Sequence, residues 1–198
     1  TFTAARTALN TIVLTFSEPV TGSAISGSFT VAGASAVTNT APSASTTVTL
    51  TTTGLTSTSG TPAVNYVAAT GDILDNSPAT NEVANGGAVS AADQVKPTFT
   101  AARTALNTIV LTFSENVNAP LNDAGAWTVA GATVSGNTAV VGATSMTLTT
   151  TGLTSTSSTP TVTYVAASGD VFDTAAVPNE MADATTANAA DQVPPTFT

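Results

Sequence analysis

Several residue types are scarce or absent in this 198-residue chain, and their absence excludes whole classes of function. The chain has no cysteine, so disulfides and thiol nucleophiles are excluded, and no histidine, which removes the commonest general base. Only 3 Lys and Arg face 12 Asp and Glu, so nothing can neutralise the phosphates of a nucleic acid. No apolar run approaches the ~18 residues that cross a membrane. We therefore expect a protein that is not an enzyme, binds no nucleic acid and has no membrane-spanning segment here.

Charged residues make up 8% of the chain and aromatic residues 5%, whereas hydrophobic residues make up 42%. The core must therefore consist mainly of Val, Ile, Leu and Ala, under a surface of Thr, Ser, Ala, Gly and Asn. Such a composition is also compatible with a disordered, mucin-like stalk. The regular spacing of apolar residues along the chain favours a folded protein instead.

The sequence repeats itself. TFTAARTALNTIVLTFSE occupies 1–18 and returns unchanged at 98–115, and TLTTTGLTSTS occupies 49–59 and returns at 147–157. We predict one repeat at 1–97, a second at 98–195, and the start of a third at 196–198, as in an array of domains. A repeat of about 100 residues has the size of one sandwich domain.

Short β-type segments follow one another within each repeat. Residues 11–16 are β-branched and aromatic, 46–52 alternate Thr with Val and Leu, and 62–68 place Val and Tyr on one face. Segments 2–5, 28–31, 35–40 and 86–92 bring the expectation to about seven strands, which is typical of a sandwich. The fold class we predict is all-β, as two tandem antiparallel sandwiches. We expect these residues and their copies to form the core: Ile12, Leu14, Phe16, Phe29, Val31, Val48, Leu50, Val64 and Tyr66.

Three motifs carry a resemblance to a known family. LTFSEPV at 14–20 and LTFSENV at 111–117 resemble the strand and Phe-Ser-Glu turn of bacterial immunoglobulin-like (Ig-like) repeat domains found in S-layer and other surface proteins. The aromatic-Thr-Val triplets at 29–31 and 127–129, and the later Tyr…Gly-Asp-x-x-Asp segments, are similar to the same family. The resemblance implies an Ig-like sandwich at the cell surface or in the extracellular space.

Ten of the 12 acids occupy equivalent positions in the two repeats. If successive strands reverse direction, the second and sixth strands end at the same end of a domain, and the seventh points toward the next domain. We therefore expect Asp93, Glu115, Asp170 and Asp173 to converge at the junction, with Glu180 nearby. Oxygen-rich clusters of this kind suit Ca²⁺. The full set of candidate ligands, half-sites at the two ends included, is Glu18, Asp72, Asp75, Glu82, Asp93, Glu115, Asp170, Asp173, Glu180 and Asp191. Two alternatives stay open: the acids are solvated charges that confer solubility, or they pair with Arg6 and Arg103.

These observations predict that the chain is a structural repeat of an extracellular layer, fibre or stalk, stiffened by interdomain Ca²⁺. The expected partners are neighbouring repeats or identical subunits. An adhesin or carbohydrate-binding module is an alternative, and its binding face would lie in the loops that differ between the copies. A spacer within a secreted enzyme is another. The terminal segment 196–198 could also complete the sandwich of a neighbouring subunit, although truncation of a longer array is the favoured explanation.

Overall fold

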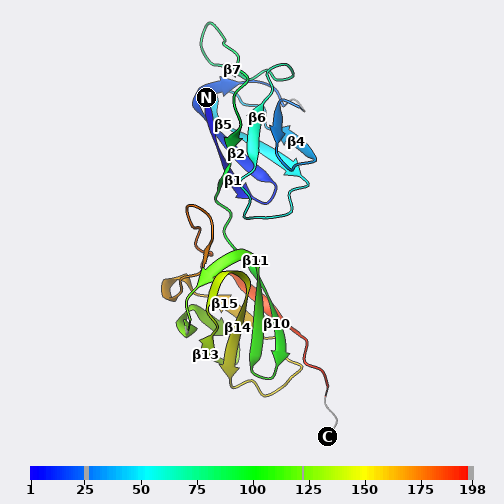
Figure 1. Ribbon diagram of the computed structural model, residues 1–198, viewed down its shortest axis with the longest axis vertical. Coiled ribbons are helices and arrows are strands. Elements are labelled where there is room, and N and C mark those ends of the chain that lie inside the picture. The colour runs from blue at the N-terminus through cyan, green and yellow to red at the C-terminus, as the bar shows by residue number, and fades with distance from the viewer. Residues whose placement is uncertain (25–26, 122, 196–198) are drawn as a thin grey trace. The chain divides into compact units, whose positions relative to one another are not determined.

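The computed structural model describes residues 1–24, 27–121 and 123–195 (Figure 1). The chain divides into two compact units, Thr1–Val95 and Lys96–Thr198. The third repeat predicted to begin at 196–198 lies outside the described residues. Because the two units repeat one sequence, their two ends correspond. The leading end of a unit is where its first strand begins, and the trailing end is where its first hairpin turns.

Unit 1 contains two sheets. The larger has the strand order β4-β5-β2-β1-β9 with the short β7 beside β2, and the smaller has the order β3-β6-β8. The last segment of the unit passes from one sheet to the other, since only Ala91 separates β8 from β9. The strands are β1 Phe2–Ala8, β2 Thr11–Thr21, β3 Phe29–Val31, β4 Ala36–Asn39, β5 Ser45–Thr53, β6 Ala63–Tyr66, β7 Leu74–Asp75, β8 Val89–Ser90 and β9 Ala92–Asp93.

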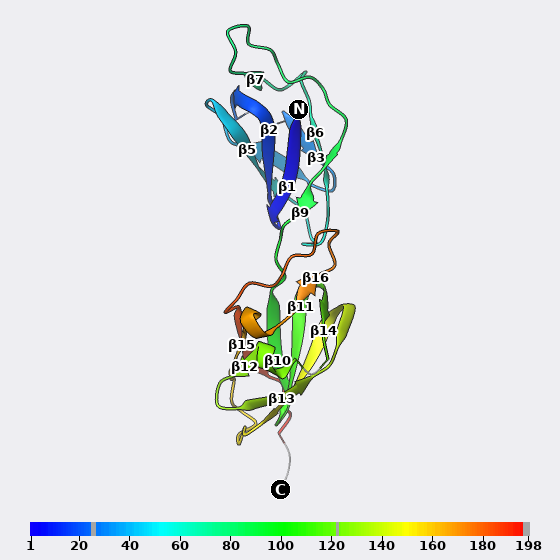
Figure 2. The same ribbon diagram turned by 90° about the vertical axis from the view of Figure 1, so that its left-hand side faces the viewer.

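Unit 2 has the same arrangement with one continuous last strand. That strand, β17, pairs with β15 on one side and β10 on the other, which joins the strands into one nearly closed sheet (Figure 2). The strands are β10 Phe99–Ala105, β11 Thr108–Ala119, β12 Trp127–Val129, β13 Thr133–Asn137, β14 Val140–Thr151, β15 Thr161–Tyr164, β16 Phe172–Asp173 and β17 Thr186–Asp191. The described residues also include the 3-10 turns η1 Ala124–Ala126 and η2 Ala166–Ser168.

The prediction of an all-β chain is confirmed, and the predicted strands coincide with those observed to within a few residues. Two differences concern pairing. The first and last strands of each unit run parallel, β1 with β9 and β10 with β17, so the sheets are not purely antiparallel. This follows from an odd count of seven main strands, because reversal at each step returns the seventh to the direction of the first. The short β7 and β16, which pair with the ends of β2 and β11, were not predicted.

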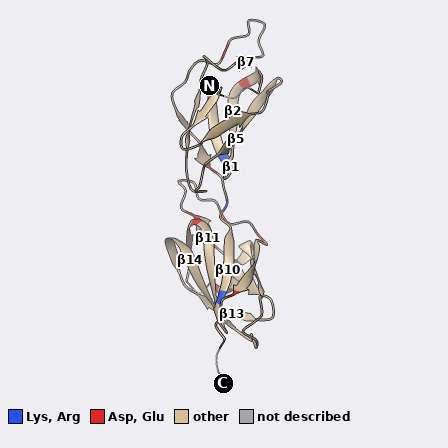
Figure 3. Ribbon diagram, turned by 90° about the vertical axis from the view of Figure 1, so that its right-hand side faces the viewer, with Lys and Arg blue, Asp and Glu red and all other residues tan. Residues whose placement is uncertain are grey.

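All nine predicted core residues of unit 1 are buried, and so are their nine counterparts in unit 2. The alternation in β5 explains the pattern: Val48 and Leu50 face inward at 0% exposure, while Thr47 and Thr51 face outward. Trp127 contacts the rings of Phe99 and Tyr164, with centroid distances of 5.3 and 5.2 Å. Charged residues are sparse on both units, and most of the strand surface carries none (Figure 3).

Candidate functional site

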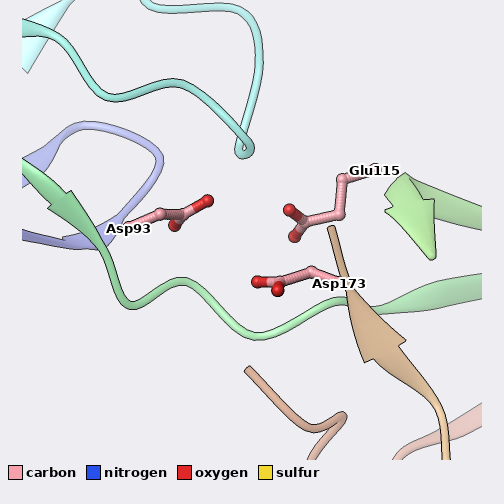
Figure 4. Close-up of side chains that lie close together, drawn as sticks. All are labelled: Asp93, Glu115 and Asp173. Carbon is pink, nitrogen blue, oxygen red and sulfur yellow. The ribbon is translucent and has the colours of Figure 1, made fainter. Parts of the chain in front are cut away.

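Two acids of unit 2 lie close together at its leading end. Glu115 lies on β11, two residues before Val117, and Asp173 on β16 pairs with Val117 in antiparallel register. Because alternate residues of a strand share a face, Glu115 points to the same side as Asp173. Both side chains are buried, at 4% and 1% exposure, and each offers a carboxylate oxygen within 4.8 Å of the other (Figure 4). This pair places two carboxylates close together in a buried environment.

Asp173 is held in place by the loop that follows it. Its Oδ1 accepts hydrogen bonds from the backbone N–H of Ala175 and of Asn179, at 3.1 and 2.8 Å. Its Oδ2 accepts a bond from the Asn179 side-chain amide at 2.7 Å. Asn179 therefore fixes the orientation of Asp173, and its backbone carbonyl closes the loop by accepting a hydrogen bond from the Asp173 N–H.

In unit 1 the equivalent aspartate, Asp75, is held by the loop that follows it in the same way. The Asp75 carboxylate accepts bonds from the N–H and hydroxyl of Ser77 and from the N–H and side-chain amide of Asn81. These bonds, that of the Asn81 amide first, lower the pKa of Asp75 to about 2. Sequence reasoning missed the two asparagines. The indication available was that Asn-Glu follows each aspartate at the same spacing, as 81–82 and as 179–180.

Glu82 and Glu180 are each placed by a tyrosine. The Tyr66 hydroxyl donates to Glu82 at 3.1 Å and accepts from the Ile73 N–H at 3.0 Å. The Tyr164 hydroxyl donates to Glu180 at 3.5 Å and accepts from the N–H of Val171 in the same way. Burial, together with the nearby glutamates, raises the pKa of both tyrosines to about 12.

The remaining predicted ligands are more dispersed. Asp72 accepts the Ser23 N–H at 2.9 Å, whereas Glu18 and Asp170 lie exposed on the surface. Among the described residues of unit 1, no three acids bring their oxygens as close together as 4.8 Å. Asp93 and Asp191 end the last strand of each unit. Their Oδ1 atoms accept the N–H groups of Val95 and Val193, at 3.0 and 2.9 Å, which gives the two segments the same local turn.

Each unit also buries its arginine, which the sequence analysis treated as a possible partner for acids. Arg6 is 1% exposed and donates to the backbone carbonyls of Leu9, Ser57, Thr58 and Gly60. It thereby ties the first hairpin to the loop that precedes β6, at the trailing end of unit 1.

Arg103 has the equivalent position in unit 2 and is fully buried. It donates to the carbonyls of Ala105, Leu106 and Ser158 and to the Ser158 hydroxyl. In the parallel register of each unit, the arginine lies opposite the aspartate that ends the last strand, Arg103 opposite Asp191 and Arg6 opposite Asp93. A charge can stay buried here because its donors are occupied by acceptors.

The comparisons with known proteins leave the function open. No protein-family model matches the chain, and neither a curated protein nor a solved structure matches it significantly. Among the described residues, no helix combines the length and the hydrophobicity that crossing a membrane requires.

Proposed function

We propose that the chain is a pair of Ig-like structural repeats from an extracellular surface protein, in which Ca²⁺ stiffens the junctions between repeats. Three observations support a structural role. The units share their first 18 residues, both are all-β, and their surface is dominated by neutral Thr, Ser and Ala. Such repeats build layers, fibres or stalks by end-to-end linkage, with neighbouring repeats or identical subunits as partners. No chemistry of catalysis enters the proposal.

The observation that carries the calcium proposal is the buried pair of Glu115 and Asp173. Two ionised carboxylates within 4.8 Å repel by roughly 3–4 kcal/mol at an effective dielectric constant of about 20. A divalent cation converts this repulsion into attraction. Carboxylate oxygens are the ligands that Ca²⁺ prefers, and the bonds from Asn179 orient one of the two carboxylates in advance.

Asp93 is the third ligand that we propose, and the connectivity of the chain supports it. The Thr98 N–H donates to the Ser114 hydroxyl at 3.0 Å, and the Ser114 N–H donates to the Thr98 carbonyl at 2.8 Å. Asp93 precedes Thr98 by five residues, which span at most about 18 Å when fully extended. The Cα of Asp93 is therefore tethered to the neighbourhood of Glu115, whatever the arrangement of the two units.

In this proposal Asp93, Glu115 and Asp173 hold the ion, and backbone carbonyls or water complete the six to eight oxygens that Ca²⁺ takes. The ion would link the last strand of one repeat to the second strand of the next. It would restrict the bending of the short Gln94–Pro97 linker without altering either fold. Asp191 would serve in the same way for a repeat that follows, and Glu18 with Asp75 for a repeat that precedes.

Calorimetry and small-angle X-ray scattering test the proposal. We expect Ca²⁺ to bind with a dissociation constant of about 10⁻⁴–10⁻³ M, the range of extracellular modules, and to narrow the distribution of interdomain distances relative to EGTA. Asp93→Asn should abolish both effects while each unit keeps its melting temperature. Asp191→Asn is the matched control, because Asp191 has the same turn and the same register with arginine but lies outside the junction. Unchanged Ca²⁺ binding by the Asp93→Asn protein would refute the proposed ligand set.

A further inference from the structure

Unit 1 has a cavity of about 370 Å³ at its leading end, and its floor is apolar. The floor is formed by Phe2, Phe16, Val20, Val83 and Val89, which come from β1, β2, β8 and the loop before β8. The volume falls within the ~300–1,000 Å³ of small-molecule sites. The cavity lies entirely within unit 1, so it is independent of the junction discussed above.

Three carboxylates line the same cavity: Glu18, Asp75 and Glu82. Two of them are engaged by their own unit, Asp75 by Asn81 and Ser77, and Glu82 by the Tyr66 hydroxyl. Glu18 is exposed at the rim. No Lys or Arg side chain lines the cavity. Three carboxylates against the single Thr1 ammonium leave the lining net negative, and in a chain of net charge −9 such a pocket concentrates cations.

The second copy shows what fills this space when larger residues are present. Met181 stands where unit 1 has Val83, and it is buried in the core of unit 2 at 1% exposure. Val83, by contrast, is only partly buried against the core of unit 1. At this position the smaller side chain of unit 1 thus leaves room that methionine occupies in unit 2.

We propose that this cavity binds an organic cation with an apolar body, namely a primary ammonium group on an aliphatic stem. The apolar floor would bury the stem, and Glu18 with its neighbouring carboxylates would bind the ammonium. The apolar floor offers carbon and no oxygen, so it suits the stem of an organic cation, whereas Ca²⁺ at this end would need further oxygens from a preceding repeat. Anionic ligands are excluded by charge. The same chemistry occurs in a free diamine and in a lysine side chain of another protein.

Binding is measured by NMR titration and calorimetry in EGTA, so that Ca²⁺ cannot compete at Glu18. The probes are 1,5-diaminopentane, Nα-acetyl-lysine methylamide and, as a neutral control, 1-pentanol. We expect both amines to shift the signals of residues 18 and 83, and pentanol to bind more weakly. Tighter binding of the diamine assigns the site to free amines, and tighter binding of the lysine derivative assigns it to a protein side chain. Because the Thr1 ammonium donates to Ser17 at the rim, the measurement is repeated with N-acetylated protein.

Two variants make the proposal falsifiable. Val83→Met should reduce amine affinity at least about tenfold by filling the cavity, and the fold should tolerate it because methionine occupies this position in unit 2. Glu18→Gln should reduce affinity roughly two- to fivefold, as expected for a partly solvated ion pair. Glu180→Gln removes a charge from unit 2 and should change nothing. Failure of the amines to bind, or equal binding by the Val83→Met protein, would overturn the inference and leave the calcium proposal untouched.

Discussion

Replacement of Arg103 by methionine would remove the buried cation that ties together the trailing end of unit 2. The methylene stem of arginine packs much as methionine does, so the change deletes the guanidinium with little loss of volume. Trp127, the only tryptophan of the chain, is 3% exposed in the core of the same unit. Its fluorescence therefore reports the unfolding of unit 2 separately from unit 1.

The magnitude follows from the contacts of the guanidinium. Its terminal nitrogens donate to the Leu106 carbonyl at 2.8 Å, the Ser158 hydroxyl at 2.7 Å and the Ser158 carbonyl at 3.2 Å. Each charge-assisted bond contributes about 1.5–3 kcal/mol, and removal of the buried charge returns several kcal/mol of its desolvation cost. We expect a net loss of about 2–3 kcal/mol in the free energy of unfolding of unit 2. With a slope of about 1–2 kcal/mol per molar urea, the midpoint should fall by roughly 1–3 M.

Urea titration followed by tryptophan fluorescence measures this shift. Arg103→Lys keeps the charge but has no planar fork, so it should lie between the methionine variant and the original protein. Arg6→Met makes the equivalent change in unit 1 and should leave the tryptophan transition where it is, which controls for nonspecific effects. The reasoning fails if Arg103→Met lies within about 0.5 kcal/mol of the original protein, the range of ordinary surface substitutions.

Three further predictions concern the core, the tyrosines and the asparagine loop. Leu14→Ala should destabilise unit 1 by about 2–5 kcal/mol, because a fully buried leucine leaves a cavity; circular dichroism during urea titration measures it. The pKa of Tyr66 and Tyr164 is raised from 10.0 to about 12, so their contribution to the free energy of unfolding is complete below pH 10 and should be lost as the pH rises to about 12. Tyrosine absorbance should show that ionisation coincides with unfolding. Ionisation near pH 10 with the fold intact would contradict this prediction. Asn179→Ala should cost unit 2 about 1 kcal/mol by tryptophan fluorescence and weaken Ca²⁺ binding, because Asp173 loses a 2.7 Å bond; unchanged affinity would argue against orientation of Asp173 by the amide.

Local patterns were sufficient to predict most of the fold. In β5 the alternation of Thr with Val and Leu determines which side chains face inward. The repetition of the sequence indicated that the chain contains two domains of the same fold. Pairing of the first strand with the last could not be predicted in this way. It joins residues such as Arg6 and Asp93, which are far apart in sequence, and the two-residue strands β8 and β9 carry too few residues for a periodic pattern.

The candidate site was predicted less completely, for two physical reasons. Arg6 was considered only as a partner for the acids, yet it follows Phe2 and Ala4 at intervals of two and so lies on their inward face. Asparagines were expected to be ordinary surface residues, although Asn81 and Asn179 orient the neighbouring aspartates. The acids themselves were identified by their repetition, but only the three-dimensional structure distinguishes the buried Glu115 from the exposed Asp170.

The parallel pairing of first and last strands has a mechanical consequence. In each unit the chain enters along the first strand at the leading end and leaves along its parallel neighbour at the trailing end. A pull on the two ends therefore loads the hydrogen bonds between these strands in shear, all at once, and cannot open them one by one as it would in a hairpin. β10 pairs with β17 over Ala101–Arg103, whereas β1 pairs with β9 only at Ala5 and Arg6. We expect unit 2 to resist the greater force in single-molecule stretching, so that under tension unit 1 would yield first and protect its neighbour.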